Sequence, residues 1–188
     1  HLDGCRIGFD LGASDYKLAA VKNGEPVFTT EIPWNPRVEP DPDWHRNKIN
    51  EGLKQAAEKL PRVDAIGGSS AGIIINNEPR VASLFRNVPS NLFTEKVRPI
   101  FRSLAEEWNV PFEVSNDGDV TALAGAMSLK QNGVLGLAMG SSQAVGFLDQ
   151  NGRITGWLNE LAFSPIDFHS SGPVDEWSGD VGCGVQYF

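Results

Sequence analysis

The stretch that decides the fold reads Ile7-Gly8-Phe9-Asp10-Leu11-Gly12-Ala13-Ser14-Asp15-Tyr16-Lys17. An apolar strand brings Asp10 to a tight glycine turn, a small hydroxyl follows at Ser14, and a second strand begins at Lys17. Such a turn can present backbone N–H groups, a hydroxyl and a cation to a phosphate group, while Asp10 holds hydrated Mg²⁺ beside it. An ordinary β-turn between two strands is the alternative interpretation.

The periodicity of the flanking residues predicts an ordered series of strands and helices. Three strands form hairpins around this turn and around Asn23-Gly24, which is a strong hairpin signal. An α-β-α-β-α series follows, in which Thr94 is expected to cap the second helix. Residues 73–92 have no clear period and predict irregular structure. The expected strands are 5–11, 17–22, 27–32, 63–66, 112–114, 134–138, 144–148 and 153–157, and the expected helices are 43–60, 94–108 and 119–129.

Composition narrows the function classes. The chain has 188 residues, of which 40% are hydrophobic, enough to bury a core. A net charge of −8 without a basic cluster argues against nucleic acid as a partner, although a local ring of amides can still bind a small anion. The sequence contains no run of about 18 apolar residues, so no membrane span is expected. No signal peptide is recognisable either.

The cysteines and histidines indicate a cellular location and which side chains are buried or exposed. Cys5 and Cys183 form no disulfide framework and are expected as buried apolar residues, which favours a reducing, cytoplasmic location. His45 and His169 are expected on the surface. The chain begins at His1 rather than Met and has no polar tail after Phe188, so we expect a segment of a longer protein.

Two further turns carry candidate ligand-binding residues. Gly140-Ser141-Ser142-Gln143-Ala144-Val145-Gly146 lies between two predicted strands, as the first turn does. Two strand–turn–strand loops of this kind, one per domain, would hold a nucleotide's phosphates from both sides. Between them, Asn116-Asp117-Gly118 places a carboxylate at a strand end, where ligands collect in α/β sheets.

Together these segments resemble the ROK family (repressor, open reading frame, kinase) of the sugar kinase, Hsp70 and actin superfamily. Three more segments extend the resemblance in the same order: residues 66–72, similar to the family's sugar-contacting strand end; 156–161, similar to its Gly…Gly-Glu segment; and 179–183, similar to its zinc loop. The resemblance implies an α/β, ribonuclease H-like (actin-like ATPase) fold, with a mixed sheet and flanking helices. Residues 1–131 would form the first domain, and 132–188 the incomplete beginning of a second, similar one.

The resemblance also implies roles for individual residues. Asp117 would be the general base that takes a proton from a sugar hydroxyl as that hydroxyl attacks the γ-phosphate of ATP. Asp10 would order Mg²⁺ through water. The groups that would meet phosphates are Gly12, Ser14, Lys17, Gly140, Ser141 and Ser142. Those that would bind the sugar are Asn116, Glu160, Ser70 and Gly72, with Asp117 beside them.

The sequence departs from the family pattern at several positions. Phe163 stands where members carry a histidine that serves both sugar and zinc, and Ser142 replaces the second glycine of the second phosphate loop. The zinc-loop positions read Glu176, Ser178 and Cys183, and one thiol cannot make a tetrahedral zinc site, so no zinc is expected. The family's adenosine-binding region lies beyond the zinc loop, where this chain ends.

Three hypotheses follow. The first is an ATP-dependent kinase of a hexose or N-acetylhexosamine, with Mg²⁺ as cofactor and Asp117 as base. The second is a sugar-sensing or structural module that has lost phosphoryl transfer. The third, an assembly ATPase of the actin or Hsp70 kind, is disfavoured by the Asn116-Asp117 turn and the Glu160 segment. Sugar and ATP are the expected partners, and a homodimer is left open.

Overall fold

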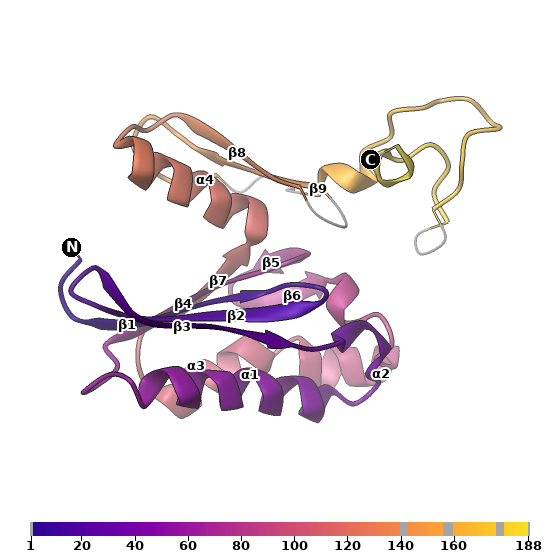
Figure 1. Ribbon diagram of the computed structural model, residues 1–188. Coiled ribbons are helices and arrows are strands. Elements are labelled where there is room, and N and C mark those ends of the chain that lie inside the picture. Colours follow the sequence, from indigo (N-terminus) through magenta and orange to yellow (C-terminus); the bar gives the residue numbers. More distant parts are fainter. Residues whose placement is uncertain (1, 140–142, 156–159, 176–178, 188) are drawn as a thin grey trace. The chain divides into compact units, whose positions relative to one another are not determined.

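The computed structural model describes residues 2–139, 143–155, 160–175 and 179–187, whose contacts group into two compact units (Figure 1). The first unit spans residues 1–115 and the second spans 116–188. From the sequence, a domain boundary is expected after residue 131. The contacts instead group the helix that precedes this point with the second unit, because glycines allow it to pack closely on the hairpin that follows.

The first unit is built on a five-stranded mixed sheet in the order β3-β2-β1-β4-β7. Its antiparallel part is β1 (Cys5–Leu11), β2 (Asp15–Lys22) and β3 (Glu25–Pro33). On the other side of β1, β4 (Ala65–Ser70) runs parallel to it, and β7 (Phe112–Asn116) forms the edge. The predicted α/β class with a mixed sheet is therefore confirmed.

The strand expected over residues 63–66 is in fact β4, which continues through the glycines to Ser70. Gly68 is paired with Phe9 of β1, and a Cβ atom at Gly68 would lie 2.2 Å from the Phe9 ring. The glycine therefore makes room for an aromatic ring on the neighbouring strand, and the strand extends beyond the end at residue 66 that the sequence predicted.

A hairpin that the sequence did not predict lies within residues 73–92. It consists of β5 (Ile73–Ile75) and β6 (Glu78–Val81), joined by Asn76 and Asn77. Both asparagines have positive φ, 53° and 58°, as a two-residue hairpin turn requires. The Asn77 amide also bonds to the β7 backbone, donating to the Phe112 carbonyl and accepting from the Val114 N–H. The Asn-Asn pair was the signal that could have revealed this hairpin.

Two long helices cover one face of the sheet (Figure 1). They are α1 (Pro42–Ala57), capped by Asp41, and α3 (Ile100–Trp108). The helix expected from Thr94 begins earlier and is interrupted: α2 (Ser90–Leu92) and a π-helical turn (Phe93–Val97) precede α3. Thr94 does not cap it, because its hydroxyl donates to the Ser90 carbonyl one turn back.

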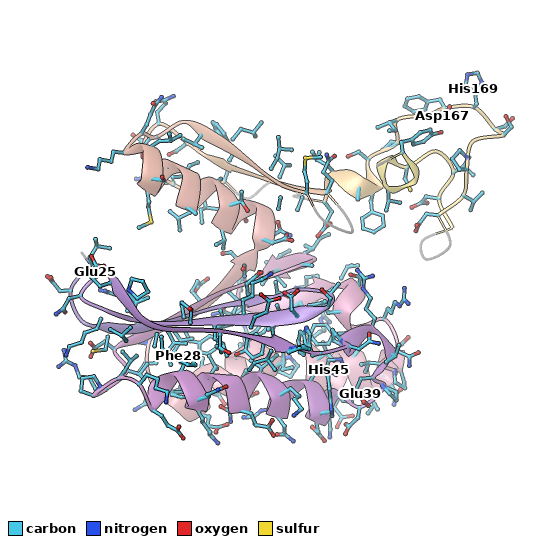
Figure 2. All side chains as sticks on the ribbon, in the orientation of Figure 1. Glu25, Phe28, Glu39, His45, Asp167 and His169 are labelled. Atoms are coloured by element: carbon cyan, nitrogen blue, oxygen red, sulfur yellow. The ribbon has the colours of Figure 1, made fainter. Side chains whose placement is uncertain are left out.

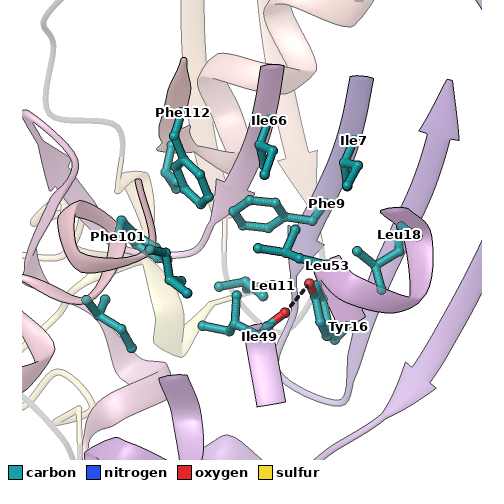
Figure 3. Packing of buried hydrophobic residues seen from close by; sticks show 14 of the residues in the cluster. Ile7, Phe9, Leu11, Tyr16, Leu18, Ile49, Leu53, Ile66, Phe101 and Phe112 are labelled. Atoms are coloured by element: carbon teal, nitrogen blue, oxygen red, sulfur yellow. Dashed lines mark hydrogen bonds between the residues drawn. The ribbon is translucent and has the colours of Figure 1, made fainter. Parts of the chain in front are cut away.

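The core of the first unit lies between this face and the two helices (Figure 3). Alternate residues of β1 and β2 point into it, and Phe9 packs edge-on against Tyr16 with ring centroids 6.3 Å apart. The Tyr16 hydroxyl donates to the Ile49 carbonyl of α1 at 3.0 Å. Burial raises the pKa of the Tyr16 phenol. The intervening residues Asp10 and Lys17 consequently face the other side of the sheet.

The expectation that His45 is a surface residue is wrong, because its side chain is fully buried near the start of α1 (Figure 2). Its Nδ1 lies 2.8 Å from the Asp41 carbonyl oxygen and its Nε2 lies 3.0 Å from that of Pro36. These contacts join the helix start to the preceding loop. His169 is exposed, as expected, and both cysteines are buried.

The second unit contains α4 (Asp117–Leu129) and a hairpin of β8 (Val134–Met139) and β9 (Gln143–Leu148). The hairpin confirms the two strands expected at 134–138 and 144–148. Glycines bring the helix directly onto it: a Cβ at Gly146 would lie 2.3 Å from the Gly118 carbonyl oxygen, and one at Gly136 would lie 2.3 Å from the Ala122 nitrogen. This close backbone packing explains why α4 groups with the hairpin.

After β9 the described residues form turns, short 3₁₀ segments and isolated bridges. The strand expected at 153–157 is represented by one bridge between Leu148 and Ile154, and residues 156 and 157 lie outside the described part. None of the helices in the described part combines the length and the apolarity that a membrane span requires.

Candidate functional site

The predicted site residues divide between the two units. The first unit holds Asp10, Gly12, Ser14, Lys17, Ser70 and Gly72, and the second holds Asn116, Asp117 and Glu160. Gly140, Ser141 and Ser142, predicted as the second phosphate loop, lie outside the described residues.

A row of polar residues crosses four strands of the first unit, on the sheet face opposite α1 and α3. Asp10 of β1 is paired with Lys17 of β2 and with Ser69 of β4, and Lys17 is paired with Glu31 of β3. The Ser69 hydroxyl donates to Asp10 Oδ1 at 2.6 Å. Asp10, Lys17 and Glu31 line an open hollow of about 580 Å³. Together they present three ionisable side chains on one concave part of the sheet.

The turn between β1 and β2 is closed by Asp15. Its backbone carbonyl accepts a hydrogen bond from the Gly12 N–H at 3.0 Å. Its carboxylate accepts one from the Ser14 hydroxyl at 3.0 Å and pairs with Lys17 Nζ at 2.8 Å. The bond from Lys17 lowers the pKa of the Asp15 carboxyl, and the same bond raises the pKa of the Lys17 ammonium.

The loop after this turn is also fixed to it. Trp34 follows β3, and its backbone N–H and indole Nε1 donate to the carbonyls of Ser14 and Gly12, at 3.1 and 2.9 Å. The indole is itself buried, stacked on Trp44 with ring centroids 6.1 Å apart. The turn is therefore held in one shape by backbone contacts at both of its ends.

Ser70 and Gly72 lie just beyond, where β4 leaves the sheet. Ser70 is fully buried, paired with the buried Leu11, and its hydroxyl contacts the Ala71 carbonyl at 3.3 Å. Gly72 has φ +103°, and a Cβ there would lie 2.3 Å from the Val81 carbonyl oxygen. A glycine is thus required at this strand end for both conformation and space.

In the second unit, Asn116, Asp117 and Glu160 come together at the start of α4. The Asn116 side chain is 3% exposed and caps the helix, because its Oδ1 accepts from the Gly118 N–H at 2.8 Å. Its Nδ2 donates to Glu160 Oε1 at 3.3 Å. These two bonds define which end of the amide is oxygen and which is nitrogen.

Asp117 is the first residue of α4 and is partly buried. Its Oδ1 also lies 3.1 Å from the Gly118 nitrogen. A carboxylate at a helix N-terminus is stabilised by the helix dipole, so the anionic form is favoured there. Asp117 thus offers a carboxylate at the strand end, the kind of group that can act as a general base.

The fold was compared with solved structures. A ROK family transcriptional regulator, a homologue of the E. coli MLC protein, matches with a TM-score of 0.69 and 19% identity, over 95% of this chain and 45% of its own. The ROK hexokinase from Thermus thermophilus matches with a TM-score of 0.67 and 20% identity, over 96% of this chain and 58% of its own. This chain has the ROK fold.

The inorganic polyphosphate/ATP-glucomannokinase of Arthrobacter sp. strain KM matches that fold with a TM-score of 0.68 and 22% identity, over 89% of this chain and 66% of its own. The chain thus spans about half to two thirds of the length of these proteins. No protein-family model and no curated protein sequence matches it.

Within this ROK fold, the segment after Glu160 lies beside the predicted zinc-loop segment. Pro165 pairs with Cys183 in an isolated bridge, and the Gly184 N–H donates to the Ser164 carbonyl at 2.9 Å. Phe163, predicted from the sequence to stand at the family's histidine position, follows Glu160 in a short 3₁₀ turn. Glu176 and Ser178 lie outside the described residues.

The residues present suit magnesium at Asp10. Among the described residues no group of three or more His, Cys, Asp or Glu side chains could hold a metal ion by itself. Mg²⁺ usually needs only one or two carboxylates, because water and substrate phosphates complete its shell. With one oxygen oriented by Ser69, the Asp10 carboxylate fits that description.

Sequence reasoning missed Ser69, Asp15 and Glu31. Ser69 was passed over in favour of Ser70, although strand alternation from Asp10 and Leu11 could have distinguished the two once β4 was recognised as paired with β1. Asp15 was given no role. Its proximity in sequence to Ser14 and Lys17 was a signal, but only the folded turn shows that it contacts both.

Proposed function

We propose that the chain forms part of a ROK-type sugar kinase, which transfers the γ-phosphoryl group of ATP to a hydroxyl of a hexose or N-acetylhexosamine. The observation that carries the proposal is the hydrogen-bonded pair Asn116–Glu160 beside Asp117 at the start of α4. The ROK fold supports it, since solved proteins of this fold include a hexokinase and a glucomannokinase.

The sugar site would be built from oriented hydrogen-bonding groups. Glu160 and Asn116 supply carboxylate and amide atoms of the kind that bind vicinal hydroxyls. Asp117 would accept the proton of the reacting hydroxyl while the new O–P bond forms and the bond to ADP breaks. A positioned base of this kind contributes roughly 10²–10⁴-fold to the rate.

The phosphate side of the reaction would use the first unit. Asp10 would hold Mg²⁺ through water, and the ion would neutralise charge on the phosphate oxygens. Ser14 and Lys17 would supply a hydroxyl and a cation to the transferred group, with Gly12 keeping the turn tight. The resemblance further assigns Ser70 and Gly72 to the sugar, and Gly140, Ser141 and Ser142 to phosphate groups.

A coupled ADP assay across a panel of hexoses and N-acetylhexosamines tests the proposal on the full-length protein. We expect turnover with at least one sugar, and a loss of about 10²-fold or more in kcat for Asp117→Asn. Glu113→Gln, which removes an exposed carboxylate from β7, is the matched control and should leave kcat unchanged. Turnover that survives Asp117→Asn at the wild-type rate would refute the assigned base.

A second candidate function is sugar binding without phosphoryl transfer. It is favoured by the first turn, where Gly12, Ser14 and Lys17 all contact Asp15. Calorimetry distinguishes the two candidates: this one predicts heat on adding a sugar and none on adding Mg·ATP. Measurable Mg·ATP affinity would exclude it.

A further inference from the structure

Asp15 contacts three of the groups that the first turn would offer to a phosphate. Its carbonyl accepts the Gly12 N–H, its Oδ2 accepts the Ser14 hydroxyl, and its Oδ1 lies 2.8 Å from Lys17 Nζ. The same Oδ1 would be 3.3 Å from a Cβ atom built at Gly12, so the carboxylate lies directly over the glycine. A carboxylate is an oxyanion that accepts from a hydroxyl and an ammonium as a phosphate does.

We propose that Asp15 is a specificity-determining residue of this turn, whose carboxylate occupies the anion position between Ser14 and Lys17 and competes there with the phosphate groups of a nucleotide. The inference rests on the proposed phosphate-binding role of the turn. It adds that the Asp15 carboxylate competes with phosphate and thereby lowers the affinity of the turn for it.

The accessibility of the pair permits such competition. The Lys17 side chain is 52% exposed, so an anion from solvent can reach its ammonium, whereas the Asp15 side chain is 22% exposed. Asp10 and Glu31 lie across the strands from Lys17, so three carboxylates surround one cation in this part of the sheet. A phosphate group entering the turn would therefore meet net negative charge and an occupied partner.

The expected size of the effect is modest, because ion pairs at this exposure are screened by water. Removing the charge of Asp15 should tighten binding of Mg·ATP and of inorganic triphosphate by about 5- to 10-fold. The gain should shrink when NaCl is raised from 50 mM to 500 mM, since salt screens exposed charges.

The test is calorimetric titration of the full chain with each of the two probes. Asp15→Asn is compared with the wild type and with Asp43→Asn. The control removes the exposed carboxylate of Asp43, a residue of α1 that pairs with Lys96. Helix α1 lies on the other face of the sheet, and the substitution makes the same change in net charge. Asp43→Asn should change affinity by less than about 2-fold.

A double-mutant cycle with Lys17→Gln locates the effect. Lys17→Gln should weaken binding, and in that background Asp15→Asn should gain clearly less than it does in the wild type. An NMR titration of the Asp15 carboxyl supplies a readout that needs no nucleotide. Its pKa is below the ordinary value in the wild type and should rise in Lys17→Gln.

The outcomes separate the inference from the proposed function. Equal, measurable affinities of the wild type and Asp15→Asn would overturn the inference and leave the kinase standing. Weaker binding by Asp15→Asn would also overturn it, because the carboxylate would then help to hold the metal. If neither protein bound triphosphate while a sugar still bound, both the inference and the kinase would be refuted.

Discussion

Asn116 and Glu160, which are 44 residues apart in the chain, are joined by a hydrogen bond from Nδ2 to Oε1 at 3.3 Å. The other end of the same amide caps α4. One side chain therefore connects the start of a helix, where Asp117 lies, to a segment that follows the hairpin.

Asn116→Asp should separate these two contacts. Aspartate caps helices as well as asparagine does, so the bond to the Gly118 N–H is kept, although a second carboxylate at this buried position should lower the free energy of unfolding. The donor to Glu160 is lost, however, and two carboxylates then face each other. We expect sugar affinity to fall by about tenfold or more, measured by calorimetry beside a thermal melt. Wild-type affinity in this variant would mean that the pair does not take part in binding.

Gly146→Ala should disrupt the packing of α4 on β9. The new methyl group would lie 2.3 Å from the Gly118 carbonyl oxygen, and the backbone on both sides leaves little room to move. We expect a loss of ~1–3 kcal/mol in the free energy of unfolding, from urea denaturation. Leu137→Ala, on the exposed side of β8, is the control and should cost less although it removes a larger group.

Gly52→Ala sets helix propensity against packing. Alanine in the middle of α1 should stabilise the helix by roughly 0.5–1 kcal/mol. The added Cβ would lie 2.5 Å from Tyr16 Cε1 and 2.7 Å from Leu18 Cδ1, inside the core. Overpacking costs typically ~1–3 kcal/mol, so we expect net destabilisation in a thermal melt. A higher melting temperature would show that Tyr16 moves aside easily.

Stability should fall in acid partly through Glu107 of α3. Hydrogen bonds from Asn50 at 2.7 Å and Arg46 at 2.6 Å lower the pKa of its carboxyl below the ordinary glutamate value of 4.5. A lowered folded-state pKa means that this contribution is present above pH 4.5 and is lost as the pH falls below it. Glu107→Gln should reduce stability at pH 7 and flatten the decline between pH 4.5 and 3, whereas Glu106→Gln should do neither. An unchanged slope in Glu107→Gln would show that the ionised carboxylate adds nothing.

Local patterns were enough for the elements whose signals lie within a few residues. The hairpins around Gly12 and Asn23-Gly24, α1, α4 and the β8–β9 pair all follow from alternation, turn residues or caps. The predicted beginning of α3 and the predicted end of β4 were wrong. A π-helical turn precedes α3, and β4 continues through two glycines, and neither conformation is the one that these residues favour locally. The burial of His45 was missed because two carbonyls from the preceding loop hold its ring.

The candidate site divides in the same way. From the sequence alone came the identities Asp10, Ser14, Lys17, Asn116, Asp117 and Glu160, since strand-end carboxylates and glycine turns are local signals. Only the tertiary structure decided that Ser69 bonds to Asp10, that Asn116 reaches Glu160, and that Asp15 contacts both Ser14 and Lys17 in the first turn. Strand register and side-chain direction determine such contacts, and both depend on partners that are distant in the chain.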